Sequence, residues 1–181
     1  MTALVRGANA QVASGEQPGL VIGVRWNLSE VECDLCALVC DSGRRALSDK
    51  HLVFFNNPAS PDGAVVLRQV EHGSATEGDR AQVQVYLPGL PQQATQVVVA
   101  LATLEPESKL DDVSNLDVTV FDPRDGEIEV TYTVGPEKSG TACLILVELY
   151  RHSGAWKVRA VGQGYDTGLR GLSIDYGISV E

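Results

Sequence analysis

The sequence has few basic residues and no long hydrophobic run. Lys and Arg number 14 against 24 Asp and Glu, which gives a formal charge of −10. Binding to nucleic acid or to an anionic membrane surface needs clustered Lys and Arg, so the composition argues against both partners. The longest apolar runs, Val97–Ala102 and Ala142–Val147, have the length of a strand and fall far short of a membrane span. Residues 1–15 lack the apolar stretch of a secretory signal, so we expect a cytoplasmic protein.

Recognisable catalytic motifs are missing too. The sequence contains neither a G-x-S-x-G nucleophile elbow nor a Walker loop. The glycine-rich string at 162–168 misses the dinucleotide-binding fingerprint by one position and is more typical of a tight turn. Three histidines stand far apart in the chain and none has H-x-x-H spacing: His51, His72 and His152. We therefore expect a protein that is not an enzyme.

What the sequence does contain is a series of strand patterns. Four segments alternate apolar with polar residues, as expected for strands with one buried face, and three are apolar throughout, as expected for strands covered on both faces. Turn-forming Pro, Gly, Asp and Ser separate them. The alternating segments are 20–26, 83–87, 128–134 and 156–160; the apolar ones are 35–40, 97–102 and 142–147, and a shorter strand is expected at 52–55.

These patterns predict an all-β fold: a β-sandwich of two mostly antiparallel sheets in a single domain over residues 1–181. Short helices are expected within 106–116 and 168–176, and residues 1–18 are expected to form an N-terminal arm. Cys33 and Cys36 would point to opposite faces of a strand, so they cannot bind one ion together. The four cysteines are therefore expected to be free thiols in a reducing compartment.

Several predicted loops carry oxygen-bearing side chains. Glu32 and Asp34 are two residues apart, so on a strand they share one face. The turn at Asp62 is expected to leave its carboxylate free. Six to eight oxygens of this kind are what Ca²⁺ requires, although the same residue types are also typical of ordinary turns. The candidate ligands are Asp34, Asn56, Asn57, Asp62, Glu77 and Asp79, followed by Glu32 and Asp49.

Two long strings give the chain a family resemblance. Residues 54–63 read F-F-N-N-P-A-S-P-D-G and residues 156–165 read W-K-V-R-A-V-G-Q-G-Y. Together with the shorter strings at 23–26, 47–49, 148–151 and 168–177, they resemble the TerD family of tellurium-resistance and stress proteins. The resemblance extends from about Gly19 almost to the end of the chain. It implies a cytoplasmic β-sandwich that binds Ca²⁺ through loop residues and acts as a scaffold or sensor in a larger complex, with protein partners that the sequence does not identify.

The chain departs from the family pattern at the expected metal ligands. Glu32-Cys33-Asp34 stands where the family usually has Asp-Leu-Asp, and Gly78-Asp79-Arg80-Ala81 stands where it usually has Gly-Asp-Asp-Glu. An Arg in place of an acidic ligand brings a positive charge to the site, which neutralises Asp79 or repels the ion. The resemblance therefore implies a divergent member in which calcium binding is weakened.

The acidic excess is concentrated outside these motifs. Residues 105–137 contain ten acidic and two basic residues. An alternative to calcium binding is thus an interaction protein with a degraded metal site, which would dock a basic partner through 105–137. A divalent-metal enzyme is a third interpretation, but no nucleophile or base is evident for it.

Overall fold

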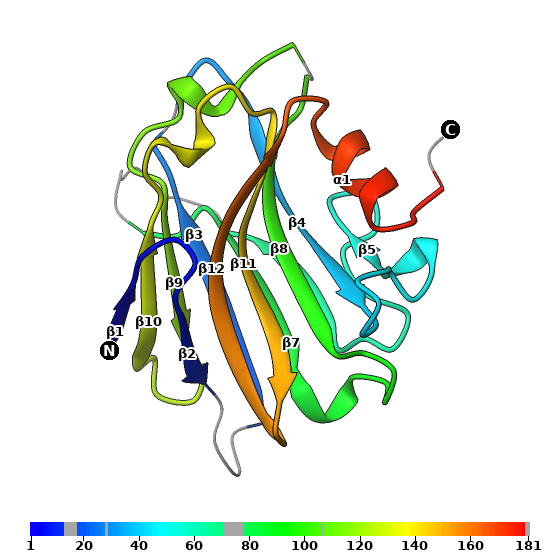
Figure 1. Ribbon diagram of the computed structural model, residues 1–181. Helices are drawn as coiled ribbons and strands as arrows, with labels where there is room; N and C mark the ends of the chain where they lie inside the picture. The colour runs from blue at the N-terminus through cyan, green and yellow to red at the C-terminus, as the bar shows by residue number, and fades with distance from the viewer. Residues whose placement is uncertain (13–17, 28, 71–77, 106, 180–181) are drawn as a thin grey trace.

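Two six-stranded sheets face each other in the computed structural model (Figure 1). The structure describes residues 1–12, 18–27, 29–70, 78–105 and 107–179. The first sheet has the order β1-β10-β9-β3-β7-β6 and the second β2-β12-β11-β8-β4-β5. All strand pairs are antiparallel except β1 with β10. This architecture confirms the predicted all-β sandwich of two mostly antiparallel sheets.

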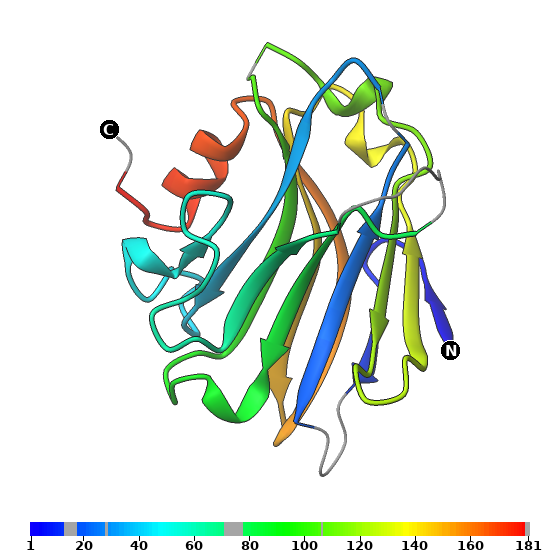
Figure 2. The ribbon, with the colours of Figure 1, turned by 180° about the vertical axis from the view of Figure 1, so that it is seen from behind.

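The first sheet, in front in Figure 2, consists of β1 (Thr2–Leu4), β10 (Ile128–Thr133), β9 (Asp117–Phe121), β3 (Gly19–Arg25), β7 (Ala81–Tyr86) and β6 (Val65–Gln69). The second consists of β2 (Asn9–Val12), β12 (Ala155–Tyr165), β11 (Cys143–His152), β8 (Gln96–Thr103), β4 (Cys33–Cys40) and β5 (Leu52–Val53). Four 3₁₀ turns and one α-helix complete the described chain: η1 (Asp49–His51), η2 (Leu87–Gly89), η3 (Leu110–Asp112), η4 (Pro136–Lys138) and α1 (Leu169–Asp175).

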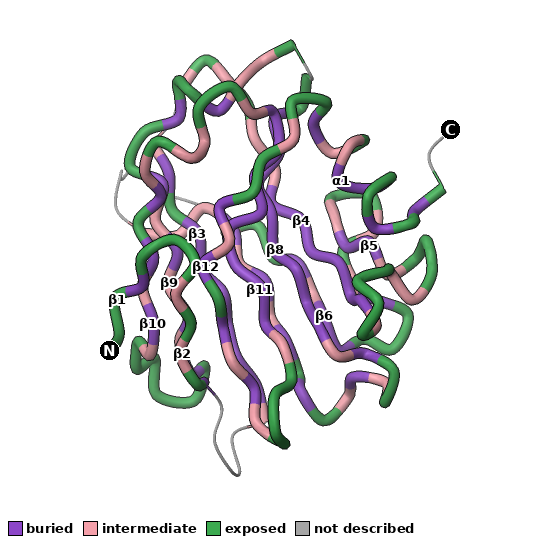
Figure 3. Tube along the Cα trace, viewed as in Figure 1, coloured by how far each residue is buried: buried purple, intermediate pink, exposed green. Residues whose placement is uncertain are grey.

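The central strands β4 and β8 are buried on both faces, as their apolar sequences predict (Figure 3). Leu35, Ala37 and Val39 of β4 point into the core between the sheets. Cys36, Leu38 and Cys40 point to the other side, into a second apolar cluster that includes Leu172 and Tyr176 from the α1 region. The short helix therefore covers part of the outer face of the second sheet.

Several features differ from the sequence prediction, and β6 and β9 are strands that it did not list. In place of an N-terminal arm, the first twelve residues contribute one strand to each sheet, because β1 pairs with β10 and β2 with β12. The helix expected within 106–116 is, in its described part, only the 3₁₀ turn η3. The strand expected at 52–55 ends at Val53, since Phe54 turns back to form a bridge with Asn57.

The four cysteines are free, as predicted. Cys36, Cys40 and Cys143 are buried and Cys33 is half-buried. Burial raises the pKa of the Cys36 and Cys40 thiols to about 12, with the nearby carboxylates Asp34 and Asp41 acting in the same direction. These thiols are packing groups and not nucleophiles at neutral pH.

Candidate metal site

Glu32 and Asp34 line the same open cavity of about 330 Å³, at the beginning of β4. Ser29, Gln69 and Arg80 also contribute to its lining. Cys33, which lies between them, lines the same cavity, so the cavity shows that Glu32 and Asp34 are neighbours and leaves their shared strand face a prediction. Carboxylate, amide and hydroxyl groups are hard donors of the kind that Ca²⁺ prefers.

The negative charges of the two carboxylates at this cavity are not balanced by hydrogen bonds or ion pairs to them within the described residues. Burial, and after it the negative charge of Glu32, raise the pKa of the Asp34 carboxyl above its ordinary value. Within the described part of the chain, no group donates a hydrogen bond to the Asp34 carboxylate. Such a carboxylate gains stability from any cation that enters the cavity.

Arg80 brings the opposing charge to this cavity. The Nε of its guanidinium donates a hydrogen bond to the backbone oxygen of Trp26, and the backbone N–H of Arg80 donates one to the carbonyl of Val24. This arrangement anchors the guanidinium to the end of β3 and not to either carboxylate. The positive charge is therefore a fixed neighbour of the candidate site, and it lowers affinity for a metal cation.

Asp79 lies apart from the Asp34 cavity. Ile22 and Val24 face the core, so Gly23 between them faces outward on the first sheet. Asp79 packs directly over this glycine, and a Cβ at position 23 would collide with Asp79 Oδ2. The same oxygen accepts a hydrogen bond of 2.9 Å from Gln82 Nε2. Glu77, its expected companion, lies outside the described residues.

Asp62 is already saturated by its own loop. Ser60 Oγ and the backbone N–H of Ala64 donate hydrogen bonds to Oδ1 at 2.7 and 2.9 Å, and His51 Nε2 lies 3.4 Å from Oδ2. Burial acts to raise the pKa of this carboxyl, but these partners outweigh it and hold the pKa below its ordinary value. The expectation that the turn leaves this carboxylate free is therefore wrong.

The remaining candidates belong to the same loop region. Asn57 uses its Nδ2 to donate to the carbonyls of Lys50 and Leu52, at 2.9 and 2.8 Å. Asp49 Oδ1 accepts a hydrogen bond of 3.0 Å from the backbone N–H of Ser179. Asn56 is exposed. Asn57 therefore connects the loop after β5 to the backbone at Lys50 and Leu52, and Asp49 connects η1 to Ser179.

The seven candidate ligands that the structure describes thus do not converge on one point. Asp62 precedes β6, whereas Gln69 at the far end of that strand lines the Asp34 cavity, so strand geometry separates the two groups by roughly 13 Å or more. No group of three or more His, Cys, Asp or Glu side chains that could hold a metal occurs within the ranges that the structure describes. Among the described candidates, Glu32 and Asp34 line one cavity together.

Sequence reasoning missed Gln69 and Ser29 as neighbours of Asp34. Gln69 reaches the cavity because β6 pairs with β7, and the sequence pattern of the short segment 65–69 does not predict this pairing. Ser29 lies in the loop before β4, where its Oγ bonds to the backbone of Val31. A polar residue at the end of a weak strand was the only sequence signal available for Gln69.

The acidic segment 105–137 does not form one surface. η3 precedes β9 and the 122–127 turn follows it, so the acidic side chains divide between opposite ends of the first sheet. At the first end, Glu30, Glu32 and Glu105 surround a hollow of about 400 Å³. At the other end, Asp122 is paired with Arg124 at 2.7 Å. The acidic residues of 105–137 are therefore divided between two ends of the sheet, and docking of a partner through this segment stays a prediction.

None of the helices in the described ranges has the length and apolar character needed to cross a membrane.

The chain is 28% identical over 175 residues to general stress protein 16U of Bacillus subtilis, covering 90% of this chain and 91% of that protein. It is 26% identical over 187 residues to the tellurium resistance protein TerD of Serratia marcescens, covering 97% of each.

The solved structures with the same fold include a homologue of the telluride resistance protein TerD from Streptomyces coelicolor A3(2). It superimposes with a TM-score of 0.64 at 22% identity, over 84% of this chain and 92% of that one. The family comparison is more extensive, because the TerD domain matches residues 1–176. This protein therefore belongs to the TerD domain family.

Proposed function

We propose that this protein is a non-enzymatic stress-response module of the tellurium-resistance type, located in the cytoplasm, which binds Ca²⁺ weakly through Asp34 and Glu32 and serves as a scaffold or sensor for protein partners. The stress and tellurium connection rests on what its relatives are named for. The single observation that supports calcium binding is the pair of carboxylates facing one cavity, with the pKa of Asp34 raised by burial and by Glu32.

The donor chemistry around Asp34 suits calcium. Glu32 and Asp34 would supply the carboxylate oxygens, with the Gln69 amide and the Ser29 hydroxyl as neutral donors on the same cavity. A bound cation would neutralise the repulsion between the two carboxylates. Arg80 acts against this gain, so the proposed affinity is low, and Arg80→Gln should raise it several-fold.

Thermal unfolding and calorimetry with Ca²⁺, after treatment with EGTA, test the proposal. A ligand specific to the native state stabilises it by about 2.7 kcal/mol at 100 times its dissociation constant, so millimolar Ca²⁺ should raise the melting temperature. Asp34→Asn should remove this rise. Asp112→Asn is the matched control, because Asp112 is exposed and its loss changes the net charge by the same amount. An unchanged melt in the unsubstituted protein would sink the calcium proposal.

A second function, docking of a basic partner, is favoured by the hollow between Glu30, Glu32 and Glu105. Leu104 lines this hollow and also the Asp34 cavity, and it is 48% exposed. An apolar side chain among carboxylates suits the stem and head of a Lys or Arg side chain. Binding of an Arg-rich peptide should weaken as NaCl rises from 50 to 300 mM, and Leu104→Ser should weaken it at both salt concentrations. Salt-independent binding would contradict this second function.

A further inference from the structure

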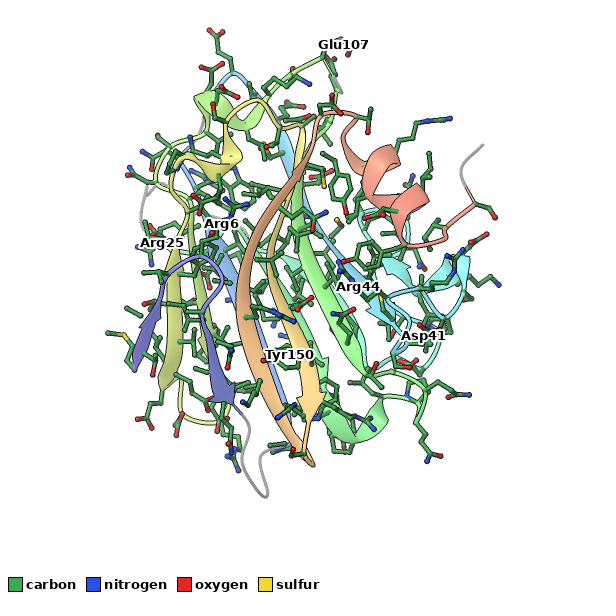
Figure 4. All side chains as sticks on the ribbon, in the orientation of Figure 1. Arg6, Arg25, Asp41, Arg44, Glu107 and Tyr150 are labelled. Carbon is green, nitrogen blue, oxygen red and sulfur yellow. The ribbon has the colours of Figure 1, made fainter. Side chains whose placement is uncertain are left out.

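A polar cavity of about 200 Å³ lies on the outer face of the second sheet, away from the Asp34 cavity. Glu148 and Arg159 face each other there from paired strands β11 and β12, and Gln96 joins them from β8. Arg44 reaches the cavity from the loop after β4; it is labelled on this face of the sandwich in Figure 4, as is Tyr150 of β11.

The floor of this cavity is a buried carboxylate with defined partners. The Glu148 side chain is only 6% exposed, and Arg159 forms an ion pair with it. Arg159 Nε donates to Glu148 Oε1, and Gln96 Nε2 donates to Glu148 Oε2, both at 2.7 Å. Since a carboxylate only accepts hydrogen bonds, its contact with Gln96 fixes which end of that amide is nitrogen.

The other end of the Gln96 amide is left over. Gln96 is 8% exposed and lines the cavity, yet its Oε1 is buried with no hydrogen-bond partner among the described residues. A buried acceptor without a partner is unfavourable, and native structures rarely retain one. This oxygen therefore calls for a hydrogen-bond donor from outside the described chain.

Arg44 brings hydrogen-bond donors and a positive charge to the same cavity. Its backbone has a φ of +60°, a left-handed conformation that is unfavourable for most residues other than Gly, Asn and Asp. The guanidinium donates from Nη2 to the Tyr176 hydroxyl at 3.0 Å and stands 5.7 Å from the centre of that ring. Its other N–H groups make no further hydrogen bond within the described ranges. With Arg159, it leaves the cavity with one positive charge in excess over Glu148.

We propose that this cavity binds a small oxyanion that carries its own hydroxyl group. The guanidinium groups of Arg44 and Arg159 would bind its charged oxygens, and Gln96 Oε1 would accept the hydrogen bond from its O–H. Glu148 beside them disfavours an anion without a proton, because such an anion has no donor to offer and is repelled by the carboxylate. Hydrogen phosphate and hydrogen tellurite share this chemistry.

The residues of this cavity are separate from those of the calcium proposal. Glu148 lies in the 148–151 string, and Arg159 and Gln163 lie in the 156–165 string, both of which carry the family resemblance. The calcium proposal uses none of these residues. The inference therefore stands apart from calcium binding, and the two fail separately.

Calorimetric titration in EGTA at pH 7 with phosphate, tellurite or sulfate, at matched ionic strength, tests the proposal. Phosphate or tellurite should bind at least tenfold more tightly than sulfate, which carries no proton at this pH. Whichever of phosphate and tellurite binds more tightly is the preferred ligand of the cavity. Equal binding of sulfate, or no binding of any of the three, would overturn the proposal.

Two arginine variants locate the site. Arg44→Gln should weaken phosphate or tellurite binding at least tenfold without loss of folding, because Arg44 is exposed and its backbone conformation is already unfavourable for a side chain. Arg45→Gln removes the same charge from the next residue, which does not line the cavity, and should leave binding unchanged. Gln96→Met should reduce the preference over sulfate. Equal losses in the two arginine variants would show nonspecific charge attraction and contradict the proposal.

Discussion

Asp34 and Asp62 have the same side chain and were candidates for the same metal site, but their surroundings are opposite. Asp62 accepts two hydrogen bonds on one oxygen and faces His51 with the other. Asp34 faces a cavity with a second carboxylate beside it. The pKa of Asp62 is lowered and that of Asp34 is raised.

The difference shows how a turn residue can be told from a ligand. A carboxylate whose lone pairs are occupied by its own loop stabilises that loop and has little to gain from a cation. A carboxylate held near another one, without described donors, is destabilising until something neutralises it. In this chain, Asp62 is of the first kind and Asp34 of the second, although their sequence contexts look equally suitable for calcium.

The largest effect should come from removing the saturated carboxylate. Asp62→Ala leaves the Ala64 N–H and the Ser60 hydroxyl without their acceptor, and hydrogen bonds to charged groups contribute about 2 kcal/mol. Urea unfolding in EGTA should show this loss, whereas Asp34→Ala should cost much less. Asp112→Ala, at an exposed position, provides the baseline. If Asp34→Ala were the more destabilising variant, the comparison would be reversed.

The pH dependence of the two sites should have opposite signs. Because the folded pKa of Asp62 is lowered, its contribution is present above the unfolded value of about 3.9 and is lost as pH falls through the folded pKa. The folded pKa of Asp34 is raised, so the native state binds more protons than the unfolded chain above pH ~3.9, and stability falls as pH rises through that window.

Denaturation from pH 3 to 7 in EGTA, with the two Asp→Asn variants, measures these slopes. Asp62→Asn should be less stable than the unsubstituted protein at pH 7 by about 1 kcal/mol, with a difference that shrinks in acid. Asp34→Asn should be slightly more stable at pH 7, and this gain should also vanish in acid. Parallel pH profiles for the two variants would contradict the assigned environments.

The sequence predicted the parts of the fold in which one strand carries the whole signal. β4 and β8 are apolar on both faces, so their burial followed directly from composition. β1 and β2 are short, and each is stabilised by a partner more than 100 residues away, a long-range pairing that local patterns do not contain. β6 was missed for a similar reason, since its five residues end in Arg68 and Gln69.

The candidate site was predictable only in part. Glu32 and Asp34 line one cavity because they are close in sequence at the beginning of β4, and Cys33 between them lines it too. The direction of a loop side chain follows no spacing rule. Asp62 points toward Ser60 and Ala64 because both donate hydrogen bonds to it. Asp79 packs over Gly23, where the absence of a side chain leaves room for it. Spacing fixes direction within a strand, but hydrogen-bond competition decides it in a loop.

The smallest expected effect separates charge from hydrogen bonding at Asp62. His51 Nε2 approaches Asp62 Oδ2 at 3.4 Å, while its Nδ1 lies 2.7 Å from Ser48 Oγ. If the hydrogen bonds to Oδ1 dominate, His51→Gln should cost only about 0.5 kcal/mol at pH 7, which is the size of a weak coupling between side chains near the surface. A double-mutant cycle with Asp62→Asn, followed by urea unfolding, isolates the coupling between the two side chains. A coupling well above 1 kcal/mol would mean that the imidazole, and not the turn, holds this carboxylate in place.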